Sequence, residues 1–134
     1  MSTSVELIQS GITTLCYLIH PDFTAAETTF ITPADARQQV GFIVYPKGGE
    51  IRRHIHRPLE RHLVGMSEVL IVRSGHAQVD IYDDDQHLVA TRDLLAGAVV
   101  VRGGGGHGFR LLEDTVLLEI KQGPYLGAQD KALF

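Results

Sequence analysis

Short apolar and β-branched runs, each closed by turn residues, recur along this chain and constrain its fold more than any other feature. The runs cover residues 14–19, 28–32, 40–45, 50–56, 68–73, 77–82, 88–92, 98–102, 108–112 and 116–121. Glycine, proline and aspartate separate them. No stretch sustains the spacing of an amphipathic helix, although residues 6–12 or 33–39 could form a single turn or short helix. Strands so short and so closely spaced predict an all-β, antiparallel sandwich or barrel.

Length and composition predict one globular domain. The chain has 134 residues, of which 44% are hydrophobic and 21% are charged, as is usual for a folded protein with a single core. A formal charge of −4 argues against nucleic acid as a partner. No segment has the pattern of a signal peptide or the length of a membrane span, so we expect a cytoplasmic protein without membrane contact. Cys16 is the only cysteine, and its apolar surroundings favour a buried structural thiol over a nucleophile.

Two histidines one residue apart, His54 and His56, are the first candidate ligands. Residues i and i+2 of a strand point to the same face, so a strand over residues 50–56 would deliver both imidazoles into one space. Arg52 would share that face, while the intervening isoleucines would take the other. Periodicity leaves two alternatives open. The polar face either lines an interior site that holds a metal, or it is solvated and the isoleucines point to the core.

A carboxylate and a third histidine follow downstream. Glu68 stands at the start of an apolar run, which is an unusual place for a charge that only contacts solvent. His107 follows four consecutive glycines, whose backbone freedom would let the chain bring this imidazole back over a pocket. Imidazole and carboxylate groups of this kind suit a borderline divalent metal ion.

The spacing of these residues resembles the two motifs of the cupin superfamily. The first motif is matched by Gly48, His54, His56, Glu68 and Gly75, and the second by Gly97, Gly104 and His107. The resemblance extends over residues 40–121 and implies a double-stranded β-helix, also called a jelly-roll or cupin barrel, within a single domain over residues 1–134. It also implies that His54, His56, Glu68 and His107 hold one divalent metal ion, such as Fe, Ni, Mn or Zn.

The stretch between the second histidine and the glutamate departs from the cupin pattern. Residues 57–67 make this gap longer than usual, and Glu60 within them stands at the ordinary distance from His56. We favour Glu68 as the ligand because it keeps the expected context of a strand followed by a tight turn. His62 is a further candidate ligand or pocket residue.

Other residues are candidates for the lining of a pocket. Arg52 could clamp a carboxylate or phosphate, or it could instead form a salt bridge with Glu50 or Glu60. Phe109 shares the strand face of His107, so we expect it to line the barrel.

The C-terminal part narrows the resemblance to the small single-domain cupin-fold proteins of the WbuC type. This similarity is carried by the segments 107–110 and 113–125, together with Asp130, Lys131 and Phe134. Arg102 stands where the second motif usually has proline, and the asparagine usual after His107 is absent. This resemblance implies a fold and a metal but no particular reaction.

The expected function is metal-dependent chemistry on, or binding of, a small polar or anionic molecule, for example a sugar derivative. The metal would act as a Lewis acid or as a centre for oxygen chemistry, in an isomerase, an epimerase or a dioxygenase. An alternative of another class is a sensor or storage module that binds a metal or ligand without turnover, and a third is a cupin that has lost its metal. We expect a homodimer with residues 1–39 at the contact, because an open sheet leaves edge strands to be covered.

Overall fold

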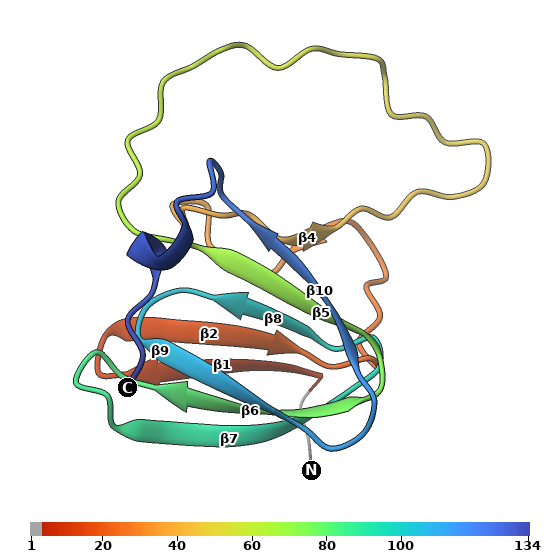
Figure 1. Ribbon diagram of the computed structural model, residues 1–134. Coiled ribbons are helices and arrows are strands. Elements are labelled where there is room, and N and C mark those ends of the chain that lie inside the picture. The colour runs from red at the N-terminus through yellow and green to blue at the C-terminus, as the bar shows by residue number, and fades with distance from the viewer. Residues whose placement is uncertain (1–3) are drawn as a thin grey trace. The chain divides into compact units, whose positions relative to one another are not determined.

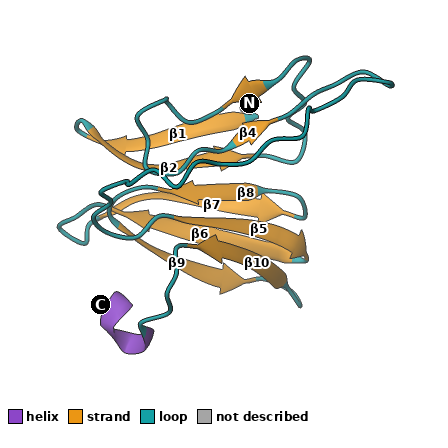
Figure 2. Cartoon of the chain, turned by 90° about the horizontal axis from the view of Figure 1, so that it is seen from above, coloured by secondary structure: helices purple, strands orange, loops and turns teal. Residues whose placement is uncertain are grey.

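The computed structural model describes residues 4–134, which divide into two compact units. The larger unit combines the N-terminal residues up to 23 with residues 66–134, and the smaller unit is residues 24–65. Regular structure is almost entirely strand, apart from one short 3₁₀ helix, η1 (Gly127–Asp130) (Figure 2). No helix among the described residues is long and apolar enough to cross a membrane. The all-β, antiparallel class predicted from the sequence is confirmed.

The larger unit contains a five-stranded sheet in the order β1-β2-β8-β5-β10 (Figure 1). Its strands are β1 (Val5–Ser10), β2 (Thr13–Ile19), β8 (Val99–Arg102), β5 (Glu68–Ser74) and β10 (Val116–Lys121). Each neighbouring pair runs antiparallel. The order differs from the order along the chain because β8 inserts between β2 and β5.

A three-stranded antiparallel sheet completes the larger unit, in the order β7-β6-β9. Its strands are β6 (His76–Tyr82), β7 (Leu88–Leu95) and β9 (Gly106–Leu111). The chain passes from one sheet to the other after β5, β7, β8 and β9. Within the described part of the chain, hydrogen-bonded strands do not join these sheets into a closed barrel.

The core lies between the two sheets and follows from the alternation of each strand. Leu70 and Val72 of β5 and Val100 of β8 are buried, and they belong to the same apolar cluster as Val79 and Ile81 of β6. Burial of an aliphatic side chain of this size stabilises a fold by roughly 1.5–3 kcal/mol. The parity of β5 also decides the position of Glu68, because it lies two residues before Leu70 and therefore on the core-facing side.

The smaller unit contains one short hairpin and a long loop. β3 (Thr29–Phe30) pairs with β4 (Gly41–Phe42), and the backbone N–H of Val40 donates to Oγ1 of Thr32 at 3.0 Å. Residues 43–65 contain neither helix nor strand (Figure 1). Loops of this length without secondary structure are uncommon in compact domains, where they are usually either functional or linker segments.

Two local predictions were wrong, and a third was met only as a turn. Residues 50–56 do not form a strand, since they lie in the long loop and pair with no other strand among the described residues. Residues 6–12 do not form a helical turn, because β1 instead pairs with β2 through the turn at Gly11, where φ is +59°. Residues 33–39 form the single turn rather than the short helix, with the N–H of Ala36 donating to the carbonyl of Pro33 at 3.0 Å.

Candidate functional site

A row of charged side chains crosses the inner face of the five-stranded sheet. Glu68, the first residue of β5, pairs with Arg102 of β8 on one side and with Lys121 of β10 on the other. Directly paired residues of antiparallel strands point to the same face. Leu70 and Val72 continue that face of β5 into the buried core. The row therefore faces the second sheet, at the point where the apolar core ends.

His107 meets this row from the second sheet. It lies in β9 opposite Ile81 of β6, and its ring contacts that of Phe109 with a centroid distance of 5.7 Å. Atom Nε2 of His107 is 3.0 Å from Oε1 of Glu68, and the side chain of Glu68 is only 9% exposed. Phe109 itself packs against the core. The structure thus brings Glu68 together with His107 and Phe109, which follow it about forty residues later in the sequence.

The surroundings of Glu68 favour its charged form. The hydrogen bond with His107 acts most strongly, and with contributions from Glu119 and Arg102 it lowers the pKa of Glu68 from 4.5 to about 2. Burial acts in the opposite direction and is outweighed. At neutral pH Glu68 is therefore a carboxylate, which is the form that binds metal ions and accepts protons.

Arg102 holds the two chain segments that lead into this pair. Its Nη1 donates to the carbonyl of Met66 at 2.8 Å, and its Nη2 donates to the carbonyl of Gly105 at 3.1 Å. Its Nε lies 3.9 Å from Oε1 of Glu68, beyond hydrogen-bond distance, and is buried without a hydrogen-bond partner. The guanidinium therefore supplies positive charge next to Glu68 without forming the two-pronged pair usual between arginine and a carboxylate.

The glycine run explains how β9 starts in the right place. The N–H of Gly103 donates to the carbonyl of Leu15 at 2.8 Å, and the N–H of Gly105 donates to Oδ1 of Asp84 at 3.1 Å. Gly105 has a φ of +68°, and a Cβ atom at this position would collide with the carbonyl oxygen of Tyr82. Only glycine fits there, because both the backbone conformation and the close approach exclude a side chain.

A cavity of about 500 Å³ in the larger unit borders the pair formed by Glu68 and His107. Its charged lining residues are Glu68, Asp83, Asp84, Arg102, Glu119, Lys121, Asp130 and Lys131. Phe109 and Phe134 add apolar walls, and the ring of Phe134 contacts that of Tyr82 edge-on at 5.0 Å. The volume and the mixture of polar and apolar walls suit a small polar molecule.

The other predicted site residues belong to the smaller unit. Arg52, His54, His56, Glu60 and His62 are all exposed and lie in the loop over residues 43–65. The rings of His54 and His56 contact each other with a centroid distance of 5.1 Å, and Nδ1 of His54 is 2.8 Å from the carbonyl oxygen of Arg52. Neither strand-based alternative applies to these histidines, because the segment is not a strand.

Part of the cavity wall consists of residues that were not predicted as pocket residues from the sequence. Glu119 and Lys121 continue the core-facing side of β10 beyond Leu117, and their side chains lie 3.6 Å apart, from Nζ to Oε2. The alternation of apolar and charged residues in this strand was a usable signal. Asp130 and Phe134 come from the C-terminal segment after β10, for which the sequence offered no strand pattern.

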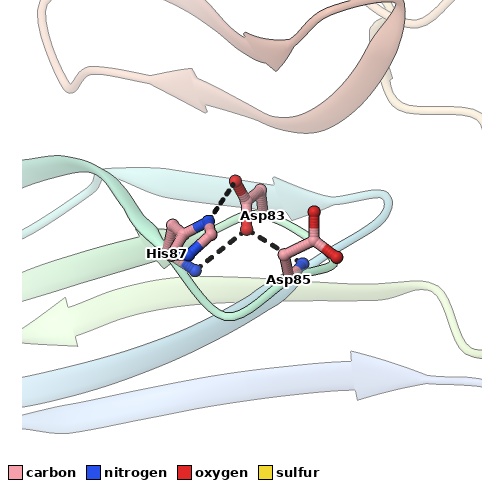
Figure 3. Close-up of side chains that lie close together, drawn as sticks. All are labelled: Asp83, Asp85 and His87. Atoms are coloured by element: carbon pink, nitrogen blue, oxygen red, sulfur yellow. Dashed lines mark hydrogen bonds and ion pairs between the residues drawn. The ribbon is translucent and has the colours of Figure 1, made fainter.

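Asp83, Asp85 and His87 form a second group of ligand-type side chains, at the turn between β6 and β7 (Figure 3). Oδ1 of Asp83 accepts hydrogen bonds from the backbone N–H groups of Asp85 and His87, each at 2.9 Å. Its Oδ2 lies 3.6 Å from Nδ1 of His87. The Asp83 side chain thus stabilises the turn by accepting hydrogen bonds from the backbone of Asp85 and His87, as aspartate commonly does, and this accounts for the cluster.

No protein-family model matches this chain, and neither a curated protein nor a solved structure is detectably similar to it.

Proposed function

We propose that this protein is a metal-binding cupin with a jelly-roll fold, in which Glu68 and His107 are metal ligands. The observation that carries the proposal is the 3.0 Å approach of a buried carboxylate and an imidazole from opposite sheets, at the edge of a cavity. Structural ion pairs also bring such groups together, but they do not require a cavity beside them.

The chain path supports the jelly-roll part of the proposal. Four connections cross from one antiparallel sheet to the other, and strands distant in sequence become neighbours, as with β2 and β8. Crossing connections of this kind characterise jelly-roll sandwiches, in contrast to meanders of consecutive hairpins.

The chemistry of the donor groups fits a divalent metal ion. Glu68 offers a carboxylate oxygen that is ionised at neutral pH, and His107 offers a ring nitrogen already directed at it. On sequence grounds, His54 and His56 are the further ligands. Nitrogen and oxygen donors in this ratio suit Fe, Ni, Mn or Zn.

The substrate or ligand is a small polar or anionic molecule, for which a sugar derivative is one example. A bound metal would act as a Lewis acid or as a centre for oxygen chemistry, as in isomerases, epimerases and dioxygenases. The chain itself would contribute the cationic Lys121 and the acidic Glu119 as polar contacts in the cavity wall. Phe109 would keep water from one side of the Glu68–His107 pair.

Metal analysis of protein purified without a histidine tag tests the proposal. We expect about one metal ion per chain in the wild type and a large loss in His107→Ala. A matched variant, His20→Ala, removes a partly buried histidine that also contacts a glutamate but does not line the cavity, and it should retain its metal. A metal-free wild type would contradict the proposal.

The double variant His54→Ala/His56→Ala tests the two ligands that are proposed from the sequence alone. Loss of metal would assign these residues to the site. Full occupancy would restrict the site to the larger unit.

The homodimer also stays a prediction. β1 is an edge strand, and Leu7 within it is 47% exposed, so this strand is the part of the N-terminal region that a second copy would cover. Size-exclusion chromatography with light scattering would reveal the mass, and a purely monomeric protein would contradict the prediction.

A further inference from the structure

Arg102 differs from the other arginines of the larger unit that have identified partners. Arg92 donates through Nε to Glu6 at 2.8 Å, and Arg110 donates through Nη2 to Asp80 at 2.8 Å, so both bind carboxylates. Arg102 instead donates one hydrogen bond from each of its terminal nitrogens to a backbone carbonyl. Its side chain is 17% exposed, compared with 41% for Arg92 and 58% for Arg110.

The two carbonyls that Arg102 binds belong to the segments that place the candidate ligands. Met66 precedes Glu68 by two residues, and Gly105 precedes His107 by two residues. These segments enter different sheets, because β5 starts at Glu68 and β9 starts at Gly106. A single guanidinium thus ties together the starts of two strands that otherwise have no backbone pairing.

The same two hydrogen bonds direct the terminal nitrogens of Arg102 away from the carboxylate of Glu68. With Nη1 and Nη2 directed at these carbonyls, the contact of Arg102 with the carboxylate is through Nε, at 3.9 Å. A two-pronged arginine pair would take up the carboxylate lone pairs that a metal ion needs. The observed arrangement provides a nearby positive charge and leaves the carboxylate in contact with His107.

We propose that Arg102 is a positioning residue that fixes Glu68 and His107 relative to each other for metal binding. The inference rests on the proposed function, since it assigns these two residues as ligands. Lysine would keep the positive charge of arginine but not both hydrogen bonds, because a single ammonium group lacks the planar fork that reaches two carbonyls at once. Residues that orient metal ligands typically contribute about 10- to 100-fold in metal affinity.

Titration with Co²⁺, followed by visible absorption, tests this role in Arg102→Met and Arg102→Lys. We expect Co²⁺ affinity to fall by about 10- to 100-fold in Arg102→Met and by less in Arg102→Lys. The bands of Co²⁺ in saturated Arg102→Lys should also shift, because the ligands are oriented differently. Arg92→Met is the matched control and should keep the wild-type affinity and spectrum, since Arg92 does not line the cavity.

Hydrogen–deuterium exchange in the metal-free protein provides a second and independent measurement. Exchange at residues 66–68 and 103–107 should become faster in both Arg102 variants than in the wild type, while exchange in β6 stays unchanged. Arg102→Lys also serves if Arg102→Met fails to fold.

The outcomes separate the two proposals. If the wild type binds Co²⁺, wild-type affinity and spectrum in the Arg102 variants would overturn the role of Arg102. If the wild type binds no Co²⁺, the proposed function fails and, because the ligands are then wrongly assigned, so does the metal-positioning role. Faster exchange at residues 103–107 would in that case identify Arg102 as a structural clamp only.

Discussion

The larger unit contains two pairs of glutamate and histidine that look alike locally. In one, Nε2 of His20 lies 2.8 Å from Oε1 of Glu6, and in the other, Nε2 of His107 lies 3.0 Å from Oε1 of Glu68. Both carboxylates are largely buried, with side chains 19% and 9% exposed. Distance and burial alone would therefore give the two pairs the same role.

Their further partners differ. Arg92 of β7 donates to the second oxygen of Glu6 at 2.8 Å, so both oxygens of that carboxylate have a close partner. This cluster links β1 with β7, at one edge of each sheet. The arginine beside Glu68 stays 3.9 Å away and binds backbone carbonyls instead.

The two pairs also differ in their position relative to the cavity. Glu68 and His107 line it, whereas Glu6 and His20 do not. A saturated ion pair away from a cavity stabilises the fold, while a pair whose neighbouring cation is held back beside a cavity can bind another group. The two pairs should therefore respond differently to substitution.

The largest effect on stability is expected for Gly105→Ala. This substitution should disturb the pair formed by Glu68 and His107 but not the pair formed by Glu6 and His20. The new Cβ would meet the carbonyl of Tyr82 in a backbone conformation that side chains rarely adopt. We expect a loss of about 1–3 kcal/mol or more in the free energy of unfolding, measured with urea, together with weaker Co²⁺ binding. Gly108→Ala is the control, because a Cβ there meets no atom within 4 Å. Equal stability of the two variants would refute the strained turn.

A smaller effect should distinguish the two histidines in metal-free protein. His20→Ala leaves Glu6 largely buried with one partner fewer, and should cost roughly 1–3 kcal/mol. His107→Ala should cost less, because water in the cavity can replace the lost hydrogen bond to Glu68. Urea unfolding of the two variants at neutral pH measures the difference. A larger loss in His107→Ala would show that its pair is the structural one.

The smallest effect concerns how the free energy of unfolding depends on pH in acid. The pKa of Glu68 is about 2 in the folded protein and near 4.5 otherwise, so its contribution is present above pH 4.5 and is lost as pH falls toward 2. For Glu6, burial raises the pKa but hydrogen bonds from Arg92 and His20 outweigh it, so the sign is the same. We expect the metal-free wild type to lose stability over this range, and Glu68→Gln to show a flatter slope. An unchanged slope in Glu68→Gln would contradict the lowered pKa.

Much of the fold was predictable because strand alternation is local. The runs at residues 68–73, 77–82 and 116–121 became β5, β6 and β10 nearly as expected. The run at residues 50–56 also alternates, yet it pairs with no strand of the described residues 4–134, and Ile55 within it is 90% exposed. Alternation predicts which face a strand would bury, but a strand also requires a neighbour, which the local sequence does not specify.

The two residues that meet beside the cavity were predictable in part for a similar reason. Glu68 was singled out by its place at the start of an apolar run, and His107 by the glycines before it. The hydrogen bonds of Arg102 were not predictable, because its partners are the backbone carbonyls of Met66 and Gly105, and any residue type carries such a carbonyl. Only the fold shows which carbonyls lie within its reach.

The most direct test of the central claim compares Glu68→Gln with Glu6→Gln in the same Co²⁺ titration. Each substitution replaces a largely buried carboxylate with an amide of nearly the same shape. We predict that Glu68→Gln lowers Co²⁺ affinity by more than about 100-fold, because loss of a ligand exceeds loss of an orienting partner, and that Glu6→Gln leaves the affinity unchanged. Wild-type affinity in Glu68→Gln, or an equal loss in both variants, would contradict the assignment of Glu68 and His107 as a metal site.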